Sequence, residues 1–256
     1  MSYTATATAT ATATLAHRLG IEVSPLTNNI AAALLTVVYV QVVLGAGGVI
    51  QARLGADVSR KFIHVMASSW LVFWPLFDTM HWSWRLNILV PAVMSLKLFY
   101  KGAILRDAND EDVRTMSRSS SPSELLYGPL QFTIIMNWLG LFHFMSEEAA
   151  IIMAALGMGD GIAPLIGKYY GKHSYRMPLS SKKTLEGSIG GVFLGTIGGV
   201  YFFSYMLGIP VLTLQAILTL ATIAMVVEGT SFNNCDNILL PVAMLYSLKY
   251  VKDMFV

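Results

Sequence analysis

The sequence predicts an all-α membrane protein, a polytopic bundle of about seven to eight transmembrane helices. Of its 256 residues, 55% are hydrophobic and only 12% are charged, whereas a soluble domain carries about 25% charged residues. The mean hydropathy is +0.59. Because each span needs roughly 20 apolar residues, a chain of this length holds seven or eight. This composition excludes a soluble function, and the net charge of +2 gives no indication of a nucleic-acid partner.

The chain begins with a polar, low-complexity segment. Residues 4–14 alternate Thr and Ala, a pattern typical of disordered sequence. We therefore expect residues 1–27 to form a flexible N-terminal tail and residues 28–256 to form one integral-membrane domain. Cys235 is the only cysteine, which excludes a disulfide framework.

Eight apolar runs follow this tail, and each predicts a helix. They cover residues 29–50, 62–80, 84–104, 124–145, 147–167, 187–208, 210–229 and 237–251. The last run is short enough for an interfacial helix, so the expected count is seven or eight. If the loops alternate between the two sides, twelve Lys and Arg residues lie on one side and four on the other. Basic loops stay on the side of insertion, so we expect the basic side to be cytoplasmic or stromal.

The run 187–208 carries glycines at every fourth position, namely Gly187, Gly191, Gly195 and Gly199. In a helix these positions line one narrow strip. Because a strip without side chains lets a neighbouring helix approach closely, it predicts a helix-packing face. A groove for a lipid chain is the alternative interpretation.

An acidic residue inside the fifth run requires an explanation. Asp160 stands between Gly159 and Gly161, with Pro164 four residues later. A carboxylate at membrane depth costs a few kcal/mol unless it is paired, solvated or bound to metal. The flanking glycines allow the backbone to approach a ligand, and the proline indicates a broken helix that lines a cavity. We expect metal or phosphate chemistry here, with a structural ion pair as the alternative.

A basic loop with hydroxyl side chains follows this run. Its members are Lys168, Lys172, Arg176, Ser180, Ser181, Lys182, Lys183 and Thr184, before Glu186 and Gly187 open the next run. Cations, hydroxyl donors and the free N–H groups of a helix start together favour binding of a polyphosphate. The alternative is an ordinary basic loop on the insertion side. The loop lacks the GxxxxGK[ST] pattern of a P-loop.

Polar residues also gather between the last two runs. Glu228 and Asp236 flank a stretch that contains Asn233 and Asn234, and Asn237 follows directly. Mg²⁺ takes one or two carboxylates together with phosphate oxygens of a substrate. Taken alone, the stretch is typical of a polar turn. On the same side as Asp160 and the lysines, it predicts the second half of a nucleotide–metal site.

Two further segments lie on the basic side. Arg60 and Lys61 precede the second run, where they are typical of membrane-interface anchors, and His64 follows one turn later. A histidine here is either a packed residue or a proton acceptor near phosphate. The segment 105–123 is expected to be a solvated, mobile connector, and Glu124 fits the acidic first turn of a helix.

Several of these motifs together resemble one family of membrane enzymes. The stretch from Gly159-Asp160-Gly161 through Ser181-Lys182-Lys183-Thr184-Leu185-Glu186-Gly187 resembles the signature of CTP-dependent lipid kinases, which include polyprenol, dolichol, phytol and farnesol kinases. It also resembles the phosphatidate cytidylyltransferases. Three other segments, at 60–65, 124–130 and 228–241, resemble the phytol and farnesol kinases. The cytidylyltransferases' closing His-Gly-Gly signature is absent from the sequence. Lys183-Thr184-Leu185-Glu186 nevertheless departs toward the cytidylyltransferase form, and Ser181 replaces a common proline.

The resemblance implies transfer of the γ-phosphoryl group of CTP to the hydroxyl of an isoprenoid alcohol, with Mg²⁺ as cofactor. It implies catalytic roles for Asp160, Lys182, Lys183, Glu186 and His64. It implies nucleotide contacts at Gly159, Gly161, Lys168, Lys172, Ser181, Thr184, Gly187 and Asn237. The implied metal ligands are Asp160, Glu228 and Asp236. Glu186 would orient a lysine or bind metal, and His64 or a carboxylate would accept the alcohol proton.

Two alternative functions remain at the level of the sequence. The first is synthesis of a CDP-lipid from phosphatidate, and the second is a non-catalytic transporter or subunit with the same fold. Clustering of the carboxylates and lysines on one side argues against a transporter, whose key polar groups must be reachable from both sides. The identity of the alcohol, the oligomeric state, and the choice among plastid membrane, endoplasmic reticulum and bacterial membrane stay open.

Overall fold

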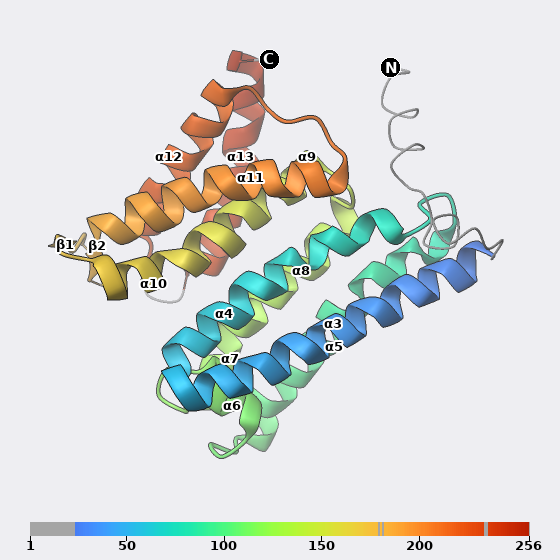
Figure 1. Cartoon of the computed structure of the whole chain (residues 1–256), viewed down its shortest axis with the longest axis horizontal. Coiled ribbons are helices and arrows are strands. Elements are labelled where there is room, and N and C mark those ends of the chain that lie inside the picture. Colours follow the sequence, from blue (N-terminus) through green and yellow to red (C-terminus); the bar gives the residue numbers. More distant parts are fainter. Residues whose placement is uncertain (1–23, 179, 181, 233–234, 256) are drawn as a thin grey trace.

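The computed structural model describes residues 24–178, 180, 182–232 and 235–255, and this part of the chain is almost entirely helical (Figure 1). Within it, the strands are β1 (Ser174–Tyr175) and β2 (Lys183–Thr184), which pair antiparallel. Most of the tail predicted for residues 1–27 lies outside the described residues. Helix α3 already begins at Pro25, so the first helix starts earlier than the apolar run indicates, because the side chain of Ser24 caps it.

The first two helical segments form an antiparallel pair. Helix α3 (Pro25–Leu54) has 30 residues, a length of about 45 Å at 1.5 Å per residue. Gly55, with a φ of 90°, makes the turn, since most other residues would be strained there. Helix α4 (Ala56–Ser68) and the 3₁₀ helix η1 (Ser69–Leu76) then return along α3.

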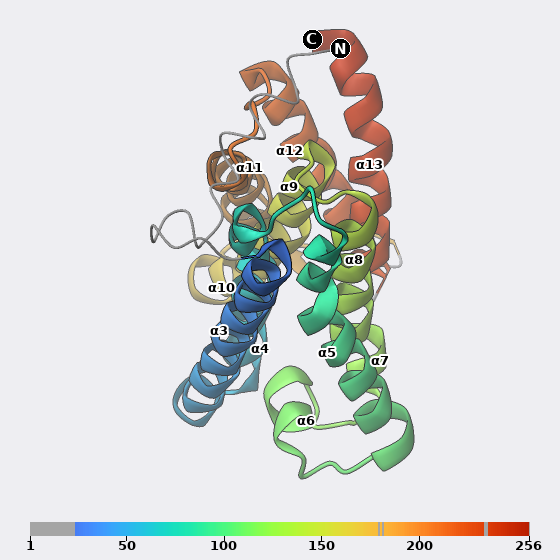
Figure 2. The ribbon, with the colours of Figure 1, turned by 90° about the vertical axis from the view of Figure 1, so that its right-hand side faces the viewer.

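The middle of the chain contributes two more segments joined by a structured connector. The first comprises η2 (Trp82–Ile88), α5 (Leu89–Phe99) and the π-helix η3 (Tyr100–Leu105). The connector contains the short helix α6 (Glu111–Met116). The second segment comprises α7 (Glu124–Tyr127) and α8 (Pro129–Phe142). Figure 2 shows α6 at the foot of α5 and α7.

Helix α6 corrects the expectation of a solvated connector at 105–123. Val113 and Met116 are buried in a hydrophobic cluster with side chains of α3, α4, α5 and α7. Asp112 is buried as well and forms an ion pair with Lys101. Lys101 also pairs with Asp110 at 2.7 Å. Burial alone would raise the pKa of Asp110, but the hydrogen bond and charge of Lys101 outweigh it and lower that pKa below its ordinary value of 3.8.

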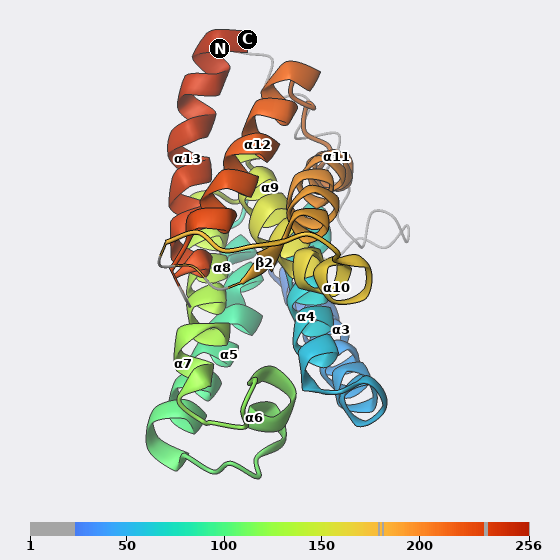
Figure 3. The same cartoon turned by 90° about the vertical axis from the view of Figure 1, so that its left-hand side faces the viewer.

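Four helical segments complete the bundle. They are α9–η4–α10 (Glu147–Met153, Ala154–Gly159, Asp160–Tyr170), η5–α11 (Gly187–Phe193, Leu194–Leu207), α12 (Leu214–Thr230) and α13 (Asp236–Phe255). In the segment 147–170, 72% of an 18-residue apolar window is buried, against 22–39% for the corresponding windows of the other long apolar segments. It therefore forms the centre of the bundle. Figure 3 shows β2 across the ends of α10 and α12.

The glycine strip confirms the prediction of a helix-packing face. A Cβ atom on Gly191 would lie 2.1 Å from Cα of Ala163, and one on Gly199 would lie 2.9 Å from Cα of Ala154. Backbones of α10, η4, η5 and α11 thus meet without intervening side chains. Because helix backbone occupies the strip, it does not form a lipid groove.

A helical segment occupies each of the eight predicted ranges, and successive segments run back and forth (Figure 1). Five of them are long and apolar enough to cross a membrane, namely 25–54, 82–105, 124–142, 147–170 and 187–207. Helix α12 is apolar but shorter. The all-α class and the membrane-length helices are therefore confirmed, and the count of seven to eight spans stays a prediction.

Candidate active site

The Gly-Asp-Gly stretch lies where η4 continues into α10, and two other helical segments pack against it. Pro164 is inside α10, so the break in the helix that the sequence predicted is not observed. A Cβ atom on Gly159 would lie 2.8 Å from Oγ1 of Thr196 in α11, and one on Gly161 would lie 2.5 Å from Cγ2 of Val65 in α4. The two glycines thus admit neighbouring helices on two sides of Asp160. This space is used for helix packing, whereas the sequence led us to expect contact with a ligand.

Asp160 lies in a buried cluster of charged and polar side chains. Its Oδ2 accepts a hydrogen bond from Nζ of Lys61 at 2.9 Å, and both side chains are less than a tenth exposed. Lys61 also donates to the backbone oxygen of Asp160 at 3.1 Å. Nε2 of His64 lies 3.6 Å from the same carboxylate and 2.9 Å from the backbone oxygen of Leu156. The structural ion pair, which was the alternative interpretation of Asp160 from the sequence, is therefore present. Its partner is Lys61, which the sequence indicated was a membrane-interface anchor.

A second buried ion pair joins the basic loop to α12. Nζ of Lys183 in β2 lies 2.5 Å from Oε1 of Glu228 and also bonds the backbone oxygen of Glu228. The hydroxyl of Tyr175, on the opposite strand, lies 2.6 Å from Oγ of Ser188. The small hairpin is thus anchored to α12 and η5, and Glu228 supports a lysine in this arrangement.

The hairpin also fixes Glu186, with a partner that differs from the expectation. Its carboxylate accepts hydrogen bonds from the backbone N–H of His173, and Nδ1 of His173 lies 2.7 Å from Oε1. Hydrogen bonds from its own backbone N–H and from His173 lower the pKa of Glu186 to about 2. Glu186 therefore closes the hairpin with a histidine, and does not orient a lysine.

The remaining residues predicted to bind nucleotide are exposed or serve packing. Lys168, Lys172 and Lys182 are exposed at the end of the bundle that carries the hairpin. Oγ1 of Thr184 accepts the N–H of Gly187 at 3.1 Å, which secures the start of the next helix. Ser181 lies outside the described residues.

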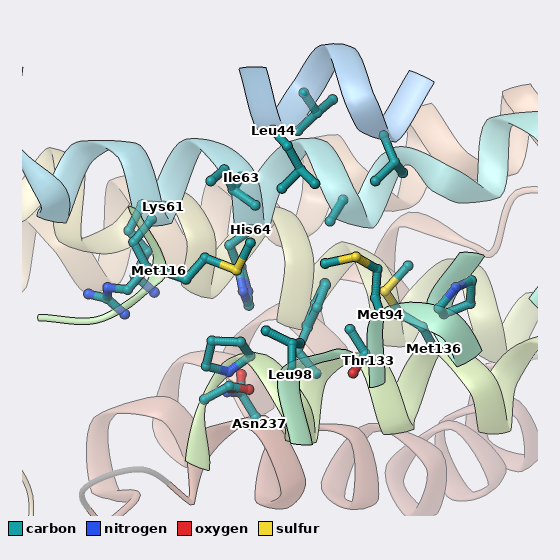
Figure 4. Close-up of a pocket in the computed structure, with 18 of the residues that line it drawn as sticks. Leu44, Lys61, Ile63, His64, Met94, Leu98, Met116, Thr133, Met136 and Asn237 are labelled. Carbon is teal, nitrogen blue, oxygen red and sulfur yellow. Dashed lines mark hydrogen bonds between the residues drawn. The ribbon is translucent and has the colours of Figure 1, made fainter. Parts of the chain in front are cut away.

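A cavity of about 410 Å³ opens beside Asp160, a volume within the roughly 300–1,000 Å³ of small-molecule pockets. Its polar lining consists mainly of Arg60, Lys61, His64, Arg118, Glu124, Asp160, Asp236 and Asn237. Beyond these side chains the lining is dominated by apolar residues from α3, α4, α5 and α8, including Leu44, Met94, Leu98 and Met136. Figure 4 shows Lys61 and Asn237 toward one end of the cavity and Met94 and Met136 toward the other.

The predicted metal ligands are only partly brought together. Among the described residues, no group of three His, Cys, Asp or Glu side chains could hold a metal ion. Asp160 and Asp236 nevertheless line the same cavity, whereas Glu228 is engaged with Lys183. Two carboxylates from different helices fit the usual donor set of Mg²⁺, which is completed by phosphate oxygens and water.

Lys61, Arg60, Arg118 and Glu124 are the charged residues at this site that the sequence did not single out as functional. Lys61 lies three positions before His64, so both face one side of α4, and this spacing was the available signal. Arg118 follows α6 in the segment expected to be solvated. No local pattern indicates that it lines a cavity.

The fold and the site define a class of protein: a helical bundle with membrane-length segments and a buried carboxylate–lysine pair at the polar end of an apolar cavity. Residues 10–230 match the profile of the Cytidylyltransferase family. The match covers most of the chain, and the protein belongs to this family.

The chain is also similar to relatives that are named as kinases. A probable phytol kinase 1, chloroplastic, from Glycine max is 31% identical over 199 residues, covering 73% of this chain and 65% of the relative. Phytol kinase 1, chloroplastic, from Arabidopsis thaliana is 29% identical over 74% of this chain and 64% of its own length. Farnesol kinase, chloroplastic, from Arabidopsis thaliana is 28% identical over 57% of this chain and 48% of its own. The matches thus span less than two thirds of these relatives. No solved structure matches the chain.

Proposed function

We propose that this protein is a CTP-dependent kinase of an isoprenoid alcohol of the phytol, farnesol or geranylgeraniol type. The alcohol oxygen forms a bond to the γ-phosphorus of CTP, and the bond from that phosphorus to the β–γ bridging oxygen breaks. CDP leaves, the alkyl monophosphate forms, and the hydroxyl proton passes to a base. The similarity to relatives named phytol kinase and farnesol kinase supports this reaction.

The observation that carries the proposal is the division of the cavity into a charged end and an apolar end. An isoprenoid alcohol has the same division, with one hydroxyl on a long hydrocarbon chain. Burial of the chain among the apolar lining contributes about 25 cal/mol per Å² of apolar surface. In this pose the hydroxyl lies beside Asp160, Lys61 and His64, where phosphoryl transfer needs positioning and compensation of charge.

Asp160 and Asp236 are the residues that would hold Mg²⁺. When bound, the ion would neutralise developing charge on the phosphate oxygens. Lys61, 2.9 Å from the carboxylate, compensates the negative charge of Asp160. Asn237 is held in place by donating to the backbone oxygen of Gly128 at 3.1 Å.

His64 is the proposed acceptor of the alcohol proton. In the neutral ring, Nε2 carries the hydrogen that bonds the backbone oxygen of Leu156, so Nδ1 retains its lone pair. The side chain of His64 extends from α4 into the cavity (Figure 4). A proton accepted at Nδ1 would be stabilised by the carboxylate of Asp160, 3.6 Å from the ring.

The lysines at the hairpin end are proposed to bind the other phosphates of CTP. Lys182 and Lys183 would lie nearest the nucleotide, with Lys168 and Lys172 assisting. Engagement of Lys183 would require it to exchange Glu228 for a phosphate. Gly159, Gly161, Gly187, Thr184 and Ser181 would then act by shaping the loop and the helix start.

The experiment uses full-length protein in detergent with γ-³²P-labelled CTP, Mg²⁺ and a panel of alcohols: phytol, geranylgeraniol, farnesol, dolichol and diacylglycerol. Transfer of label to the organic phase with an isoprenoid alcohol is expected. The variant Asp160→Asn should lose turnover, whereas Asp253→Asn, at an exposed position near the C-terminus, should retain it. Absence of transfer by folded protein with every alcohol would contradict the kinase function.

CDP-lipid synthesis is the second candidate, and the family to which the chain belongs favours it. The product separates the two reactions, since a kinase releases CDP and a cytidylyltransferase releases pyrophosphate. Supplying phosphatidate with α-³²P-labelled CTP tests the second reaction directly. Label entering the lipid would replace the kinase proposal, whereas silence in both assays would favour a non-catalytic role.

We further propose a plastid membrane as the location, with the hairpin end facing the stroma. The support is the set of relatives named as chloroplastic and the five membrane-length helices. Protease treatment of intact, isolated envelopes, with cleavage followed in the 171–186 loop, would test the orientation. Protection of that loop from protease added to the stromal face of the envelope would contradict this orientation.

A further inference from the structure

Two arginines line the polar end of the cavity without a protein partner for their guanidinium groups. Arg60 is on α4, and Arg118 follows α6. In the described part of the chain, neither guanidinium forms a hydrogen bond or an ion pair, and Nε of Arg60 is buried without a partner. A buried donor left unsatisfied costs free energy, so Nε of Arg60 indicates an absent acceptor. Arg118, which is exposed, presents a second guanidinium at the same end of the cavity.

The carboxylates that line the same end are largely engaged elsewhere. Asp160 is paired with Lys61. Glu124 accepts hydrogen bonds from the backbone N–H groups of Arg118 and Ser119 and from the hydroxyl of Ser119. These bonds hold the backbone at Arg118 in place, so its side chain is presented from a fixed position. Asp236 remains, and we have assigned it above to Mg²⁺.

The chemistry of the arginines selects the class of acceptor. A guanidinium offers a planar set of N–H donors that matches the oxygens of a phosphate in bidentate geometry. The cavity beyond the arginines is apolar and lies between α3, α4, α5 and α8, which suits a hydrocarbon chain and does not suit a ribose and a cytosine. A phosphate joined directly to a hydrocarbon chain satisfies both ends of the cavity.

We infer that Arg60 and Arg118 bind the phosphate monoester of a phosphorylated isoprenoid lipid whose chain lies in the apolar part of the cavity. The choice of an isoprenoid chain rests on the proposed function, in which this molecule is the product. The protein would then hold its product more tightly than its alcohol substrate. The bound product would inhibit turnover by competing with the alcohol, so a reaction that consumes the alkyl monophosphate would relieve this inhibition.

The test measures equilibrium binding to full-length protein in detergent, without CTP. The probes are farnesyl monophosphate, farnesol, inorganic phosphate and CTP. Farnesyl monophosphate is expected to bind at least about tenfold more tightly than farnesol, as expected for gain of a charge-assisted hydrogen bond. Inorganic phosphate at the same concentration should compete weakly, since it lacks the chain. Equal binding of farnesol and farnesyl monophosphate would overturn the inference.

Variants assign the effect to the arginines. Arg118 is exposed, so Arg118→Gln should fold, and it should weaken farnesyl monophosphate by about tenfold or more while leaving farnesol within about twofold. The affinity of Arg118→Lys for farnesyl monophosphate should lie between those of the original protein and Arg118→Gln, because lysine keeps the charge but loses the bidentate geometry. Arg114→Gln is the matched control, since Arg114 is exposed on the same segment and does not line the cavity.

Arg60→Gln should act in the same direction, and Arg118→Gln alone carries the test if the Arg60 variant is unstable. Equal weakening of farnesol and farnesyl monophosphate by Arg118→Gln would overturn the inference, and so would weakening of CTP alone. Because this assay needs no turnover, its result is independent of the kinase assay. A protein that binds farnesyl monophosphate through the arginines without phosphorylating any alcohol would refute the proposed function only.

Discussion

Replacing both members of the buried Lys61–Asp160 pair should recover stability that either single replacement removes, without recovering activity. Nζ of Lys61 lies 2.9 Å from Oδ2 of Asp160, and the side chains are only 7% and 6% exposed. Removal of one partner of such a pair leaves the other charge buried and uncompensated, at a cost of about 3–5 kcal/mol. Replacement of both by neutral groups of similar size is often neutral.

The size of the expected shift follows from the length of the chain. In a protein of about this size, 1 kcal/mol changes Tm by about 2–4 °C. Lys61→Met and Asp160→Asn should each lower Tm by about 6–20 °C. The double variant should lie above both single variants and within about 5 °C of the original protein. Thermal unfolding of the detergent-purified proteins, followed by tryptophan fluorescence at fixed scan rate, provides the comparison.

Activity separates the structural role of the pair from the catalytic one. The double variant should be folded and inactive with labelled CTP and an isoprenoid alcohol, because the carboxylate beside His64 is missing. Lys252→Met provides the control for loss of an ion pair, since Lys252 and Glu147 are 36% and 27% exposed and such pairs contribute about 0–1 kcal/mol. A double variant as unstable as the sum of both single ones would refute the coupling. An active double variant would refute the catalytic role of Asp160.

Three further predictions address packing, the cavity and the connector. Gly191→Ala should destabilise the protein by about 1–3 kcal/mol or more, since its Cβ would lie 2.1 Å from Cα of Ala163. Gly198→Ala is the control and should preserve or raise Tm, because the space at its Cβ is open. Equal effects of the two substitutions on Tm would contradict the packing role of the strip. Met94→Trp should fill part of the apolar cavity and shift kcat/KM toward shorter alcohols, and an unchanged preference would argue against this cavity as the lipid site. Because the pKa of Asp110 is lowered in the folded protein, its contribution to docking of α6 is fully present above about pH 3.8 and is lost as pH falls through the lowered pKa. Limited proteolysis of the connector should therefore be constant from pH 7 to 5, and Asp110→Asn should increase cleavage at neutral pH; cleavage unaffected by this substitution would contradict the role of the ion pair.

Local patterns were sufficient for the helices and for part of the site. Apolar runs of about 20 residues located all eight helical segments to within a few residues, because a chain in lipid must satisfy its backbone hydrogen bonds within each helix. The four-residue glycine repeat predicted a packing face, because residues four positions apart lie on the same side of a helix. Asp160 was recognisable because a carboxylate in an apolar run is costly and requires a partner.

The partner of Asp160 was not predictable from the sequence, since Lys61 and Asp160 are 99 positions apart. Any of several basic residues could have supplied the positive charge that Asp160 requires. The same limit applies to α6, whose helix is only six residues long and is stabilised by burial of Val113 and Met116 against other helices. A segment this short has little helical stability of its own. Its composition therefore resembled that of a solvated connector.

The sequence by itself thus determined the class of protein, the order of the helices and the presence of a buried carboxylate beside a basic loop. Only the tertiary structure decided which lysine pairs with Asp160, that Glu186 is bound to His173, and that Arg60 and Arg118 line the end of an apolar cavity. Hydrophobic periodicity and backbone hydrogen bonding act over a few neighbouring residues, so their effects can be predicted from the sequence. A cavity and its charges arise from side chains on α3, α4, α5, α7, α8, α10 and α13 and on the segment after α6, and their meeting depends on how the helices pack together.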